Sequence, residues 1–304
     1  MIPTTYRPNP RILVGLPYST RGALLDATHA LVAPVLISAG SCYREGRGLL
    51  PPGDAAWMAY GASLDSAGFT AMMQGGYRWS VDEYVDFIVQ GGTAGGTRPF
   101  AWSWWSAMDF CCEQEIAANR DEVERRIDAT IASLGETLAC VDEWRDEGAG
   151  ALPDPLPILQ GRTVADYTRC ADGLARELRA AGRDGLPELV GVGSVCRRQL
   201  HGPEGLLPIL SGLDRALPPH VRLHLFGVKG DVLSHLGGLR RRVASVDSMA
   251  WDFAARMDAR KAGVSCTVER RAAAMRDWYR RQVDKVLGVE VTSSAQLSMF
   301  GAPP

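Results

Sequence analysis

The stretch LPILQGRTVADYTRCADGLARELRAAGRDGLPELVGV, residues 156–192, decides the fold. Two short apolar runs, 156–159 and 189–192, flank a segment whose apolar side chains recur every three or four residues, as on one face of a helix. That segment follows Thr163, a residue type that caps helix N-termini, and Gly182 lies just beyond its end. The stretch therefore predicts a strand, a helix and a second strand, the unit from which parallel sheets are built.

The same alternation continues through most of the chain. Further apolar runs that predict strands occur at 11–16, 34–39, 59–64, 99–108, 222–226 and 242–246. With the two runs already described they make eight strands, the number in a TIM (β/α)8 barrel, so we predict an α/β fold of that class. A long helix capped by Asn119 is expected on its outside.

An open doubly wound sheet would give the same local pattern. The sequence GVGSVC, residues 191–196, is similar to the dinucleotide-binding fingerprint of such sheets. It lacks the third glycine, and no acidic residue ends a strand about twenty positions later, so the barrel is the preferred interpretation.

Composition narrows the function classes. The net charge is only −2, with 33 Lys and Arg against 35 Asp and Glu, which excludes a uniformly basic coat for nucleic acid. The seven cysteines form no CxxC pair, so neither a disulfide framework nor a structural zinc is indicated, and buried thiols are expected. No apolar run approaches the roughly 18 residues of a membrane helix, and the start MIPTTYRPNPR has no apolar signal core. We expect a cytoplasmic protein without a membrane partner.

Charge is unevenly distributed along the chain. Residues 240–285 carry twelve Arg and Lys against six Asp and Glu, whereas 119–147 is acidic. We expect a barrel over 1–260, a basic helical C-terminal extension over 261–288 and a short flexible tail over 289–304. The basic run is either the solvated face of helices or a nucleic-acid contact. The candidate contacts are Arg256, Arg260, Lys261, Arg270 and Arg271.

Polar residues close several of the predicted strands, where a barrel carries its reactive groups. They are Asp65, Asp109, Gln160, Gly193, Ser194 and Asp247. A single Asp after a strand is commonly a turn or cap residue. Three carboxylates and an amide on one rim instead suit glycosidic-bond chemistry, in which one carboxylate is the nucleophile or stabiliser and another moves a proton.

Motifs around these residues follow one another in a recognisable order. They are LDSAGF (64–69), MDFCC (108–112), ILQG (158–161), GVGSV (191–195), LHLFGVKG (223–230) and SVDSMAWDFAAR (245–256). In order and spacing the chain resembles the tRNA-guanine transglycosylase family over 34–260, and more closely the branch that places 7-deazaguanines in DNA. The resemblance implies a TIM barrel that exchanges guanine for a queuosine-related base such as preQ0 through a covalent glycosyl-enzyme, without a cofactor.

The resemblance also implies roles for the carboxylates. Asp247 matches the nucleophile that attacks the sugar C1′ and displaces guanine. Asp65 matches the residue that transfers a proton to the leaving base and from the incoming one. Asp109 and Gln160 match positions that contact the pyrimidine edge of the base.

Further positions match the walls of the base pocket. The Gly193–Ser194 backbone corresponds to the segment that contacts the carbonyl of the base. Phe69 and Phe226 correspond to side chains that sandwich it, and an aromatic face stabilises a stacked base by about 1–3 kcal/mol. Ordinary core packing is the alternative role for both phenylalanines.

The chain departs from the tRNA enzymes in one respect. Those enzymes carry a CxCxxC array and a histidine that hold a structural zinc, whereas the region from Asp258 onward contains only Cys266 and no histidine. No metal is therefore expected, and tRNA is disfavoured as the substrate. The five histidines have no ligand spacing and are expected to be structural.

The tail contains a motif of another kind. QLSMF, residues 296–300, resembles the bacterial sliding-clamp-binding peptide, in which Gln296 anchors while Leu297, Met299 and Phe300 meet an apolar groove. A tail that docks on its own barrel is the alternative. A clamp contact would tie modification to DNA replication, and the sequence leaves open whether a partner ATPase is required.

The sequence thus predicts a DNA-guanine transglycosylase, a pentosyltransferase. Three competing hypotheses remain: the same exchange on tRNA, a hydrolytic glycosidase that removes the base, and a non-catalytic module that binds modified DNA. The presence of Asp65, Asp109, Gln160 and Asp247 together argues against the last.

Overall fold

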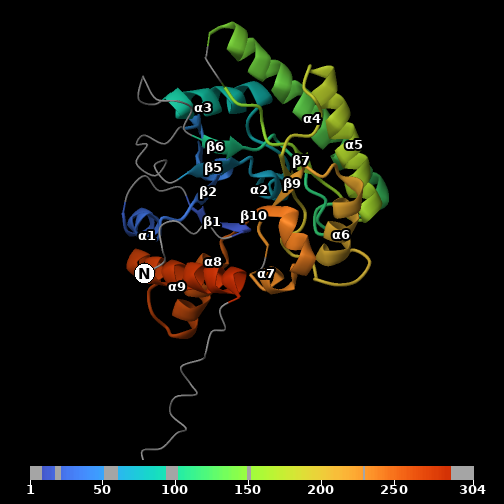
Figure 1. Cartoon of the computed structure of the whole chain (residues 1–304). Coiled ribbons are helices and arrows are strands. Elements are labelled where there is room, and N and C mark those ends of the chain that lie inside the picture. The colour runs from blue at the N-terminus through green and yellow to red at the C-terminus, as the bar shows by residue number, and fades with distance from the viewer. Residues whose placement is uncertain are drawn as a thin grey trace, which may run out of the picture.

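A parallel sheet occupies the centre of the computed structural model, with helices around it (Figure 1). The structure describes residues 9–17, 22–50, 61–93, 102–148, 152–228 and 230–288. The strands of the sheet are β1 (Arg11–Leu16), β2 (Val35–Ser38), β5 (Ala62–Asp65), β6 (Trp102–Trp105), β7 (Ile158–Leu159), β8 (Leu189–Val192), β9 (Arg222–Leu225) and β10 (Val243–Ser248). Their spatial order is β6-β5-β2-β1-β10-β9-β8-β7, and β3 (Tyr43–Arg44) and β4 (Gly48–Leu49) form a separate hairpin.

The sheet is curled but not closed by a ladder. Within the described residues β6 and β7 share no ladder, and one parallel bridge, Ser106 with Leu156, spans the gap. Leu156 N donates to Trp105 O (2.7 Å), and Ala107 N donates to Leu156 O (3.0 Å). The predicted α/β class with eight parallel strands is confirmed, and the closed barrel is corrected to an open, TIM-like half-barrel.

Proline explains why the closing edge is so short. Pro153, Pro155 and Pro157 precede β7, and proline has no N–H to donate to a neighbouring strand. In the described part of this edge, the backbone bridge to β6 is made by Leu156, which lies between two of these prolines, and β7 itself has two residues.

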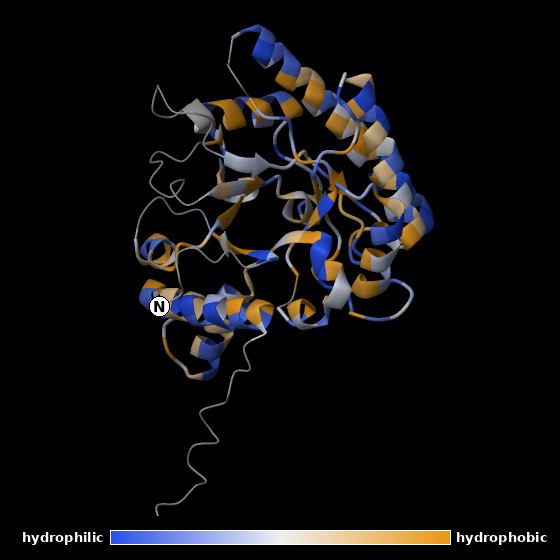
Figure 2. Ribbon diagram, viewed as in Figure 1, coloured by the Kyte–Doolittle hydropathy of each residue, from blue (hydrophilic) through white to orange (hydrophobic). Residues whose placement is uncertain are grey.

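The helices alternate with the strands and cover the sheet. They are α1 (Ala23–Leu31), α2 (Gly68–Met73), α3 (Val81–Thr93), α4 (Arg120–Asp146), α5 (Val164–Ala180), α6 (Leu206–Ala216), α7 (Val232–His235), α8 (Ala250–Lys261) and α9 (Val268–Leu287), with 3-10 turns at Ala39–Ser41 and Gly237–Arg241. Both predicted caps are confirmed: Asn119 Oδ1 accepts from Glu122 N (2.9 Å), and Thr163 forms a capping box with Asp166. Figure 2 shows blue hydrophilic and orange hydrophobic bands alternating along α4, α5 and α9, as expected of helices with one buried face.

The helix in the basic C-terminal region has one apolar face. Met275, Tyr279 and Val283, each four residues apart, are buried in the same core as the sheet. α9 packs against α1, α7 and α8 (Figure 1). The arginines of α9 therefore occupy its remaining faces. None of the described helices is long and apolar enough to span a bilayer.

Candidate active site

The predicted polar residues meet at the carboxyl ends of the strands. Asp65 is the last residue of β5, and Gln160 directly follows β7. Ser194 lies two residues past β8, and Asp109 lies four residues past β6. Asp247 sits inside β10, one residue before its end. Parallel strands place their carboxyl ends on one edge, so side chains far apart in sequence share one rim.

A chain of buried hydrogen bonds joins three of these side chains, Asp109, Gln160 and Ser194, to Ser66. Ser66 Oγ donates to Asp109 Oδ1 (2.7 Å), and Gln160 Nε2 donates to Asp109 Oδ2 (2.5 Å). Gln160 Oε1 in turn accepts from Ser194 Oγ (2.5 Å). The two contacts fix both ends of the Gln160 amide, so its donor faces Asp109 and its acceptor faces Ser194.

Glu113 extends this chain, and the sequence analysis missed it. Its Oε2 lies 3.0 Å from Ser194 Oγ, and the side chain is buried. Cys112 N donates to the same hydroxyl (2.6 Å). Ser194 has one hydroxyl proton, so it serves either Gln160 or Glu113 at a given moment. Glu113 lies one residue past MDFCC, in a loop without periodicity. Its position next to that motif is the one sequence signal that could have identified it as a site residue.

Tyr77 holds the backbone of Asp109 and was also missed. Its hydroxyl donates to Asp109 O (2.9 Å) and accepts from Asp109 N (3.0 Å). The hydroxyl also lies 3.0 Å from Ser66 Oγ, which itself binds the Asp109 carboxylate. Asp109 is thus fixed at both its backbone and its side chain, although it lies beyond the end of β6.

Small residues leave room for this network. A Cβ at Gly193 would lie 2.2 Å from Gln160 Nε2, and a Cβ at Gly68 would lie 2.7 Å from Asp109 Oδ1. Ala67 and Ser194 adopt left-handed backbone conformations, with φ of 72° and 54°. Such strained residues concentrate at functional sites, where the surrounding structure holds them in place.

Burial and mutual repulsion raise the pKa of two of the carboxyl groups. The pKa of Asp65 is raised to about 8 by burial, then by the negative charges of Asp109 and Asp247, against hydrogen bonds from Ala67 and Ser38. Burial also raises the pKa of Asp109 to about 6, although Ser66 and Gln160 donate to it. At neutral pH Asp65 therefore holds a proton while Asp109 is largely ionised.

Asp247 has a different environment. Its Oδ1 accepts a hydrogen bond from Gly227 N (2.8 Å), and its side chain is only 9% exposed. His224 Nε2, from neighbouring β9, lies 3.3 Å from the same oxygen. The sequence predicts a structural role for His224, because the five histidines have no ligand spacing. The structure places it against the predicted nucleophile.

Two half-buried aromatic rings are available at the rim. The guanidinium carbon of Arg197 lies 5.0 Å above the Phe69 ring, and Arg197 also pairs with Glu115 (3.1 Å). Phe226 packs edge-on against Trp104, with ring centroids 6.1 Å apart. The predicted pair of aromatic residues thus has different neighbours, and a cation already covers one face of Phe69.

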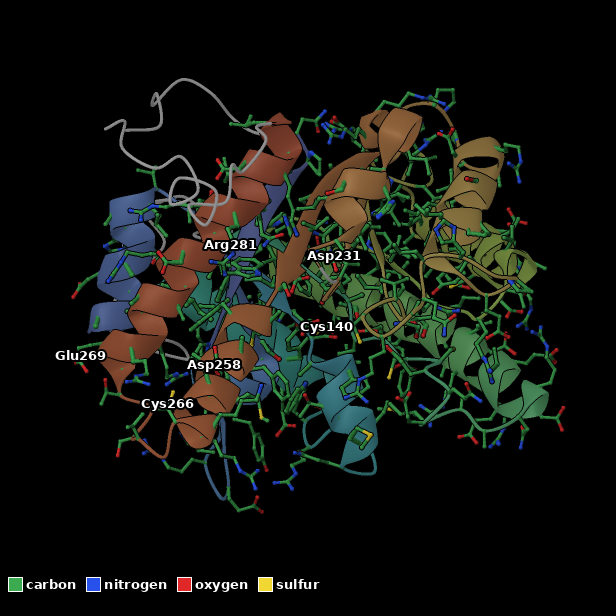
Figure 3. All side chains as sticks on the ribbon, turned by 90° about the horizontal axis from the view of Figure 1, so that it is seen from below. Cys140, Asp231, Asp258, Cys266, Glu269 and Arg281 are labelled. Atoms are coloured by element: carbon green, nitrogen blue, oxygen red, sulfur yellow. The ribbon has the colours of Figure 1, made fainter. Side chains whose placement is uncertain are left out.

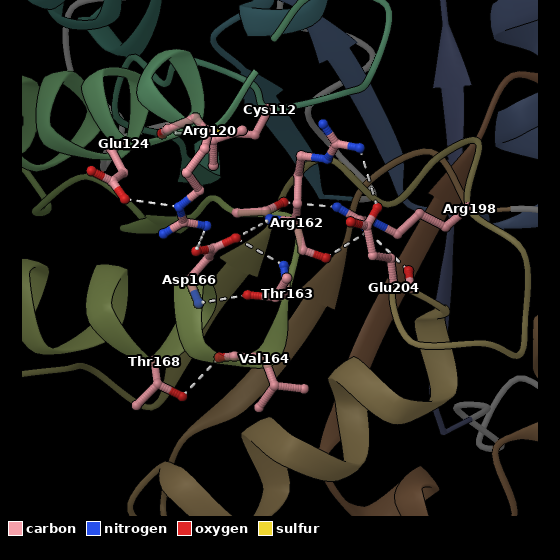
Figure 4. Close-up of polar contacts among 12 residues, drawn as sticks. Cys112, Arg120, Glu124, Arg162, Thr163, Val164, Asp166, Thr168, Arg198 and Glu204 are labelled. Carbon is pink, nitrogen blue, oxygen red and sulfur yellow. Dashed lines mark hydrogen bonds and ion pairs between the residues drawn. The ribbon is translucent and has the colours of Figure 1, made fainter. Parts of the chain in front are cut away.

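A cavity of about 730 Å³ opens beside Ser194 and Glu113. Its size is within the usual range for small-molecule sites. Arg198, on its wall, donates to the carbonyl oxygens of Ser194 (2.6 Å), Gly161 (2.7 Å) and Arg162 (2.9 Å), the last of which Figure 4 shows. Arg198 thereby ties together the loops that follow β7 and β8 and carry Gln160 and Ser194.

The predicted nucleic-acid contacts lie on α8 and at the start of α9. Arg256 and Arg271 both bind Asp252, at 2.9 and 2.5 Å. The side chains of Arg260, Lys261 and Arg270 are exposed. The same α8–α9 hairpin carries Cys266 in its turn, between Asp258 and Glu269 (Figure 3). In the described parts of the chain, no three His, Cys, Asp or Glu side chains are grouped to hold a metal ion. The clamp-like residues 296–300 lie outside the described residues.

Comparison with known proteins identifies the family. The sequence model of the family described as DpdA, DeoxyPurine in DNA protein A, matches residues 30–298. A search of curated proteins found no match. The matched range includes every strand-end residue described above and most of the chain. The chain therefore belongs to the DpdA family, the DNA-guanine transglycosylases within the tRNA-guanine transglycosylase superfamily.

Proposed function

We propose that the protein exchanges guanine in DNA for a 7-deazaguanine of the preQ0 type through a covalent glycosyl-aspartyl intermediate. The observation that carries this proposal is that Asp65 and Asp247 lie on one rim next to a fixed donor and acceptor array, where burial and neighbouring negative charges raise the pKa of Asp65. Glycosyl transfer needs one carboxyl group that gives a proton and one that stabilises or attacks the sugar carbon.

The array supports recognition of a guanine-like base. The Asp109 carboxylate accepts from the N–H groups of the pyrimidine edge, and Gln160 contacts the same edge. The Gly193–Ser194 backbone faces the base carbonyl, and Phe69 and Phe226 supply stacking surfaces. The target guanine must first leave the DNA stack, at a cost of a few kcal/mol, before its edge reaches these groups.

In the first half-reaction, an oxygen of Asp247 forms a bond to C1′ as the C1′–N9 bond breaks. The bonding electron pair leaves with guanine, and the proton of Asp65 neutralises the leaving base. The products are a glycosyl ester of Asp247, free guanine and ionised Asp65. The raised pKa of Asp65 suits this step, because a proton held at neutral pH is available for transfer.

The second half-reaction reverses these roles. The 7-deazaguanine binds to the same array, ionised Asp65 takes its N9 proton, and N9 attacks C1′. The ester bond to Asp247 breaks, which restores both carboxyl groups to their starting states. Water in place of the base would give a glycosidase, so the pocket must favour the incoming base over water.

Labelled guanine tests this proposal. Purified protein, tritiated guanine and host DNA from a strain that lacks the gene should give labelled DNA, whereas tRNA should stay unlabelled. Asp247→Ala should abolish incorporation, because no covalent intermediate can form without the carboxylate. Asp172→Asn, an exposed aspartate on α5, serves as the control and should keep full activity.

Each other outcome identifies a competing function. Label in tRNA alone would contradict a DNA substrate, and release of guanine without incorporation would identify a glycosidase. Full exchange by Asp247→Ala would contradict the assignment of the nucleophile. Mass analysis of host nucleosides with and without the gene identifies the inserted base.

We also propose that residues 296–300 bind the sliding clamp. Deletion of 296–304 should weaken clamp binding and leave exchange on short DNA unchanged. Equal clamp affinity with and without these residues would contradict the proposal.

A further inference from the structure

His224 is a fully buried histidine next to the proposed nucleophile. It lies in β9, which pairs with the strand that carries Asp247, and its side chain is 0% exposed. A buried imidazole needs partners for both of its ring nitrogens, because an unpaired buried polar group destabilises the fold. The partners of the two ring nitrogens therefore indicate the role of His224.

The first nitrogen and the ring itself are firmly held. Nδ1 lies 2.8 Å from Ser245 Oγ, on neighbouring β10. The ring packs against Trp104, with centroids 4.8 Å apart, and edge-on against Phe226, at 4.5 Å. These contacts from β6, β9 and β10 fix both the position and the rotation of the imidazole.

The second nitrogen faces the nucleophile. Within the described residues, the buried Nε2 has no well-aligned hydrogen-bond partner, and Asp247 Oδ1 lies 3.3 Å away. Asp247 Oδ1 already accepts from Gly227 N, so it acts as an acceptor there. Two unprotonated acceptors at this distance would repel each other in a buried site, so Nε2 must carry the proton.

We propose that His224 is a positioning residue for Asp247. Ser245 Oγ–H donates to Nδ1, which places the imidazole proton on Nε2, and Nε2–H together with Gly227 N–H holds Asp247 Oδ1. Oδ2 is then the oxygen presented to the sugar C1′, and Oδ1 becomes the carbonyl oxygen of the ester. At 3.3 Å a small movement of either side chain is enough to align this hydrogen bond. This inference rests on the proposed role of Asp247.

Variants at position 224 separate the donor from the shape of the ring. His224→Phe keeps a planar ring and lacks Nε2–H, whereas His224→Gln carries an amide N–H of similar reach. We expect His224→Phe to lower the kcat of guanine exchange by about 10- to 100-fold, the usual effect of removing a supporting hydrogen-bond partner, with an unchanged KM for guanine. His224→Gln should restore most of kcat.

The relative activities of these variants show whether the Nε2–H donor or the packing of the ring is required. Equal loss in folded His224→Phe and His224→Gln would overturn the proposal, because packing alone would then explain the effect. Full activity in His224→Phe would overturn it as well. Ser245→Ala should give a smaller loss than His224→Phe, because it removes only the group that orients the ring.

A measurement that needs no catalytic turnover tests the role of His224 independently of the proposed exchange reaction. Nitrogen-15 shifts of labelled histidine report which ring nitrogen carries the proton, and loss of a signal in His224→Gln assigns His224. We expect a protonated Nε2 in the wild-type protein, and an Asp247→Leu variant should shift that signal. An unprotonated Nε2 would overturn the inference even if exchange occurs. A protonated Nε2 that responds to Asp247→Leu would support it even if exchange fails.

Discussion

Asp65 and Asp109 have raised pKa values that are about 2 units apart, and this separation gives the exchange reaction a pH dependence. The pKa of Asp109 is raised to about 6, and in the proposed mechanism its carboxyl group is ionised when it accepts the N–H groups of the base. The pKa of Asp65 is raised to about 8, and in the proposed mechanism its carboxyl group is protonated when guanine is released. We therefore expect kcat/KM to rise with pH near 6 and to fall near 8, in a bell-shaped profile measured by guanine incorporation.

The variant Asp65→Asn tests the alkaline side of this pH profile. In residual activity, Asp65→Asn should lose the decline near pH 8, because the group that titrates there is gone. A profile that is flat from pH 5 to 9 in the wild-type protein would contradict both assignments.

Gly193 shows how closely the base array is packed. The added methyl group in Gly193→Ala would lie 2.2 Å from Gln160 Nε2, so the amide must move away from Asp109. We expect incorporation to fall by at least about 100-fold, since small displacements in positioned sites have effects of that order. Gly238→Ala is the matched control, because Gly238 has open space around its Cβ position. A fully active Gly193→Ala protein would show that the array tolerates a shift of Gln160.

The two site residues that were not predicted from the sequence, Tyr77 and Glu113, escaped prediction for the same physical reason. Asp65 and Asp247 directly follow the predicted strands 59–64 and 242–246, so their shared rim follows from topology. Tyr77 and Glu113 lie outside the strands, and their contacts with Asp109 and Ser194 depend on the three-dimensional course of the loops. No spacing in the sequence encodes that course.

At the scale of elements, the N-terminus of α5 combines a helix cap with an ion pair. Asp166 is buried and accepts from Thr163 N (2.9 Å) and Arg162 N (3.0 Å), and Arg120 pairs with it (Figure 4). Burial acts to raise the pKa of Asp166, but these donors outweigh it and the pKa is lowered.

Loss of either cap residue should destabilise the fold. Thr163→Ala should lower the free energy of unfolding by about 1 kcal/mol. Asp166→Ala should lower it by about 2–4 kcal/mol, because the backbone donors of Arg162 and Thr163 lose their acceptor, although Arg120 keeps its ion pair with Glu124. Urea unfolding measures both. Thr168→Ala on the same helix is the control and should change stability by less than about 0.5 kcal/mol, since its hydroxyl bonds only to Val164 O. Equal effects of Thr163→Ala and Thr168→Ala would contradict this account of the cap.

Strand prediction succeeded where apolar runs had clear boundaries. β1 and β8 have the predicted bounds, Arg11–Leu16 and Leu189–Val192. The predicted run at 99–108 is too long at its carboxyl end, because β6 ends at Trp105 and the backbone then pairs with Leu156 instead of extending the ladder. Whether a parallel sheet closes depends on both edges at once, and local periodicity reports only one strand at a time.

At the scale of the whole molecule, charge placement predicts how DNA binds. Arg260, Lys261 and Arg270 are exposed on α8 and α9, and α8 begins three residues after Asp247. Reversal of these three charges to Glu should weaken binding to host DNA. It should also flatten the plot of log affinity against log salt by about 0.9 for each phosphate contact that is lost.

A matched triple variant provides the control. Arg176, Arg179 and Arg215 are exposed on α5 and α6, and their reversal to Glu changes the net charge equally. If both triple variants bind equally weakly, the basic α8–α9 surface is not the DNA contact, and net charge alone accounts for the effect.

The single bridge between Ser106 and Leu156 has a consequence for how the protein responds to its base. Asp109 follows β6 and Gln160 follows β7, so their hydrogen bond crosses the same gap as the bridge. A base held by both side chains would therefore fasten the two edges of the sheet together. In deuterium exchange, the amides of Ala107 and Leu156 should exchange faster than that of Leu13 in central β1, and bound 7-deazaguanine should slow them selectively. Exchange at Ala107 and Leu156 that is unaffected by the base would mean that recognition and closure of the sheet are independent.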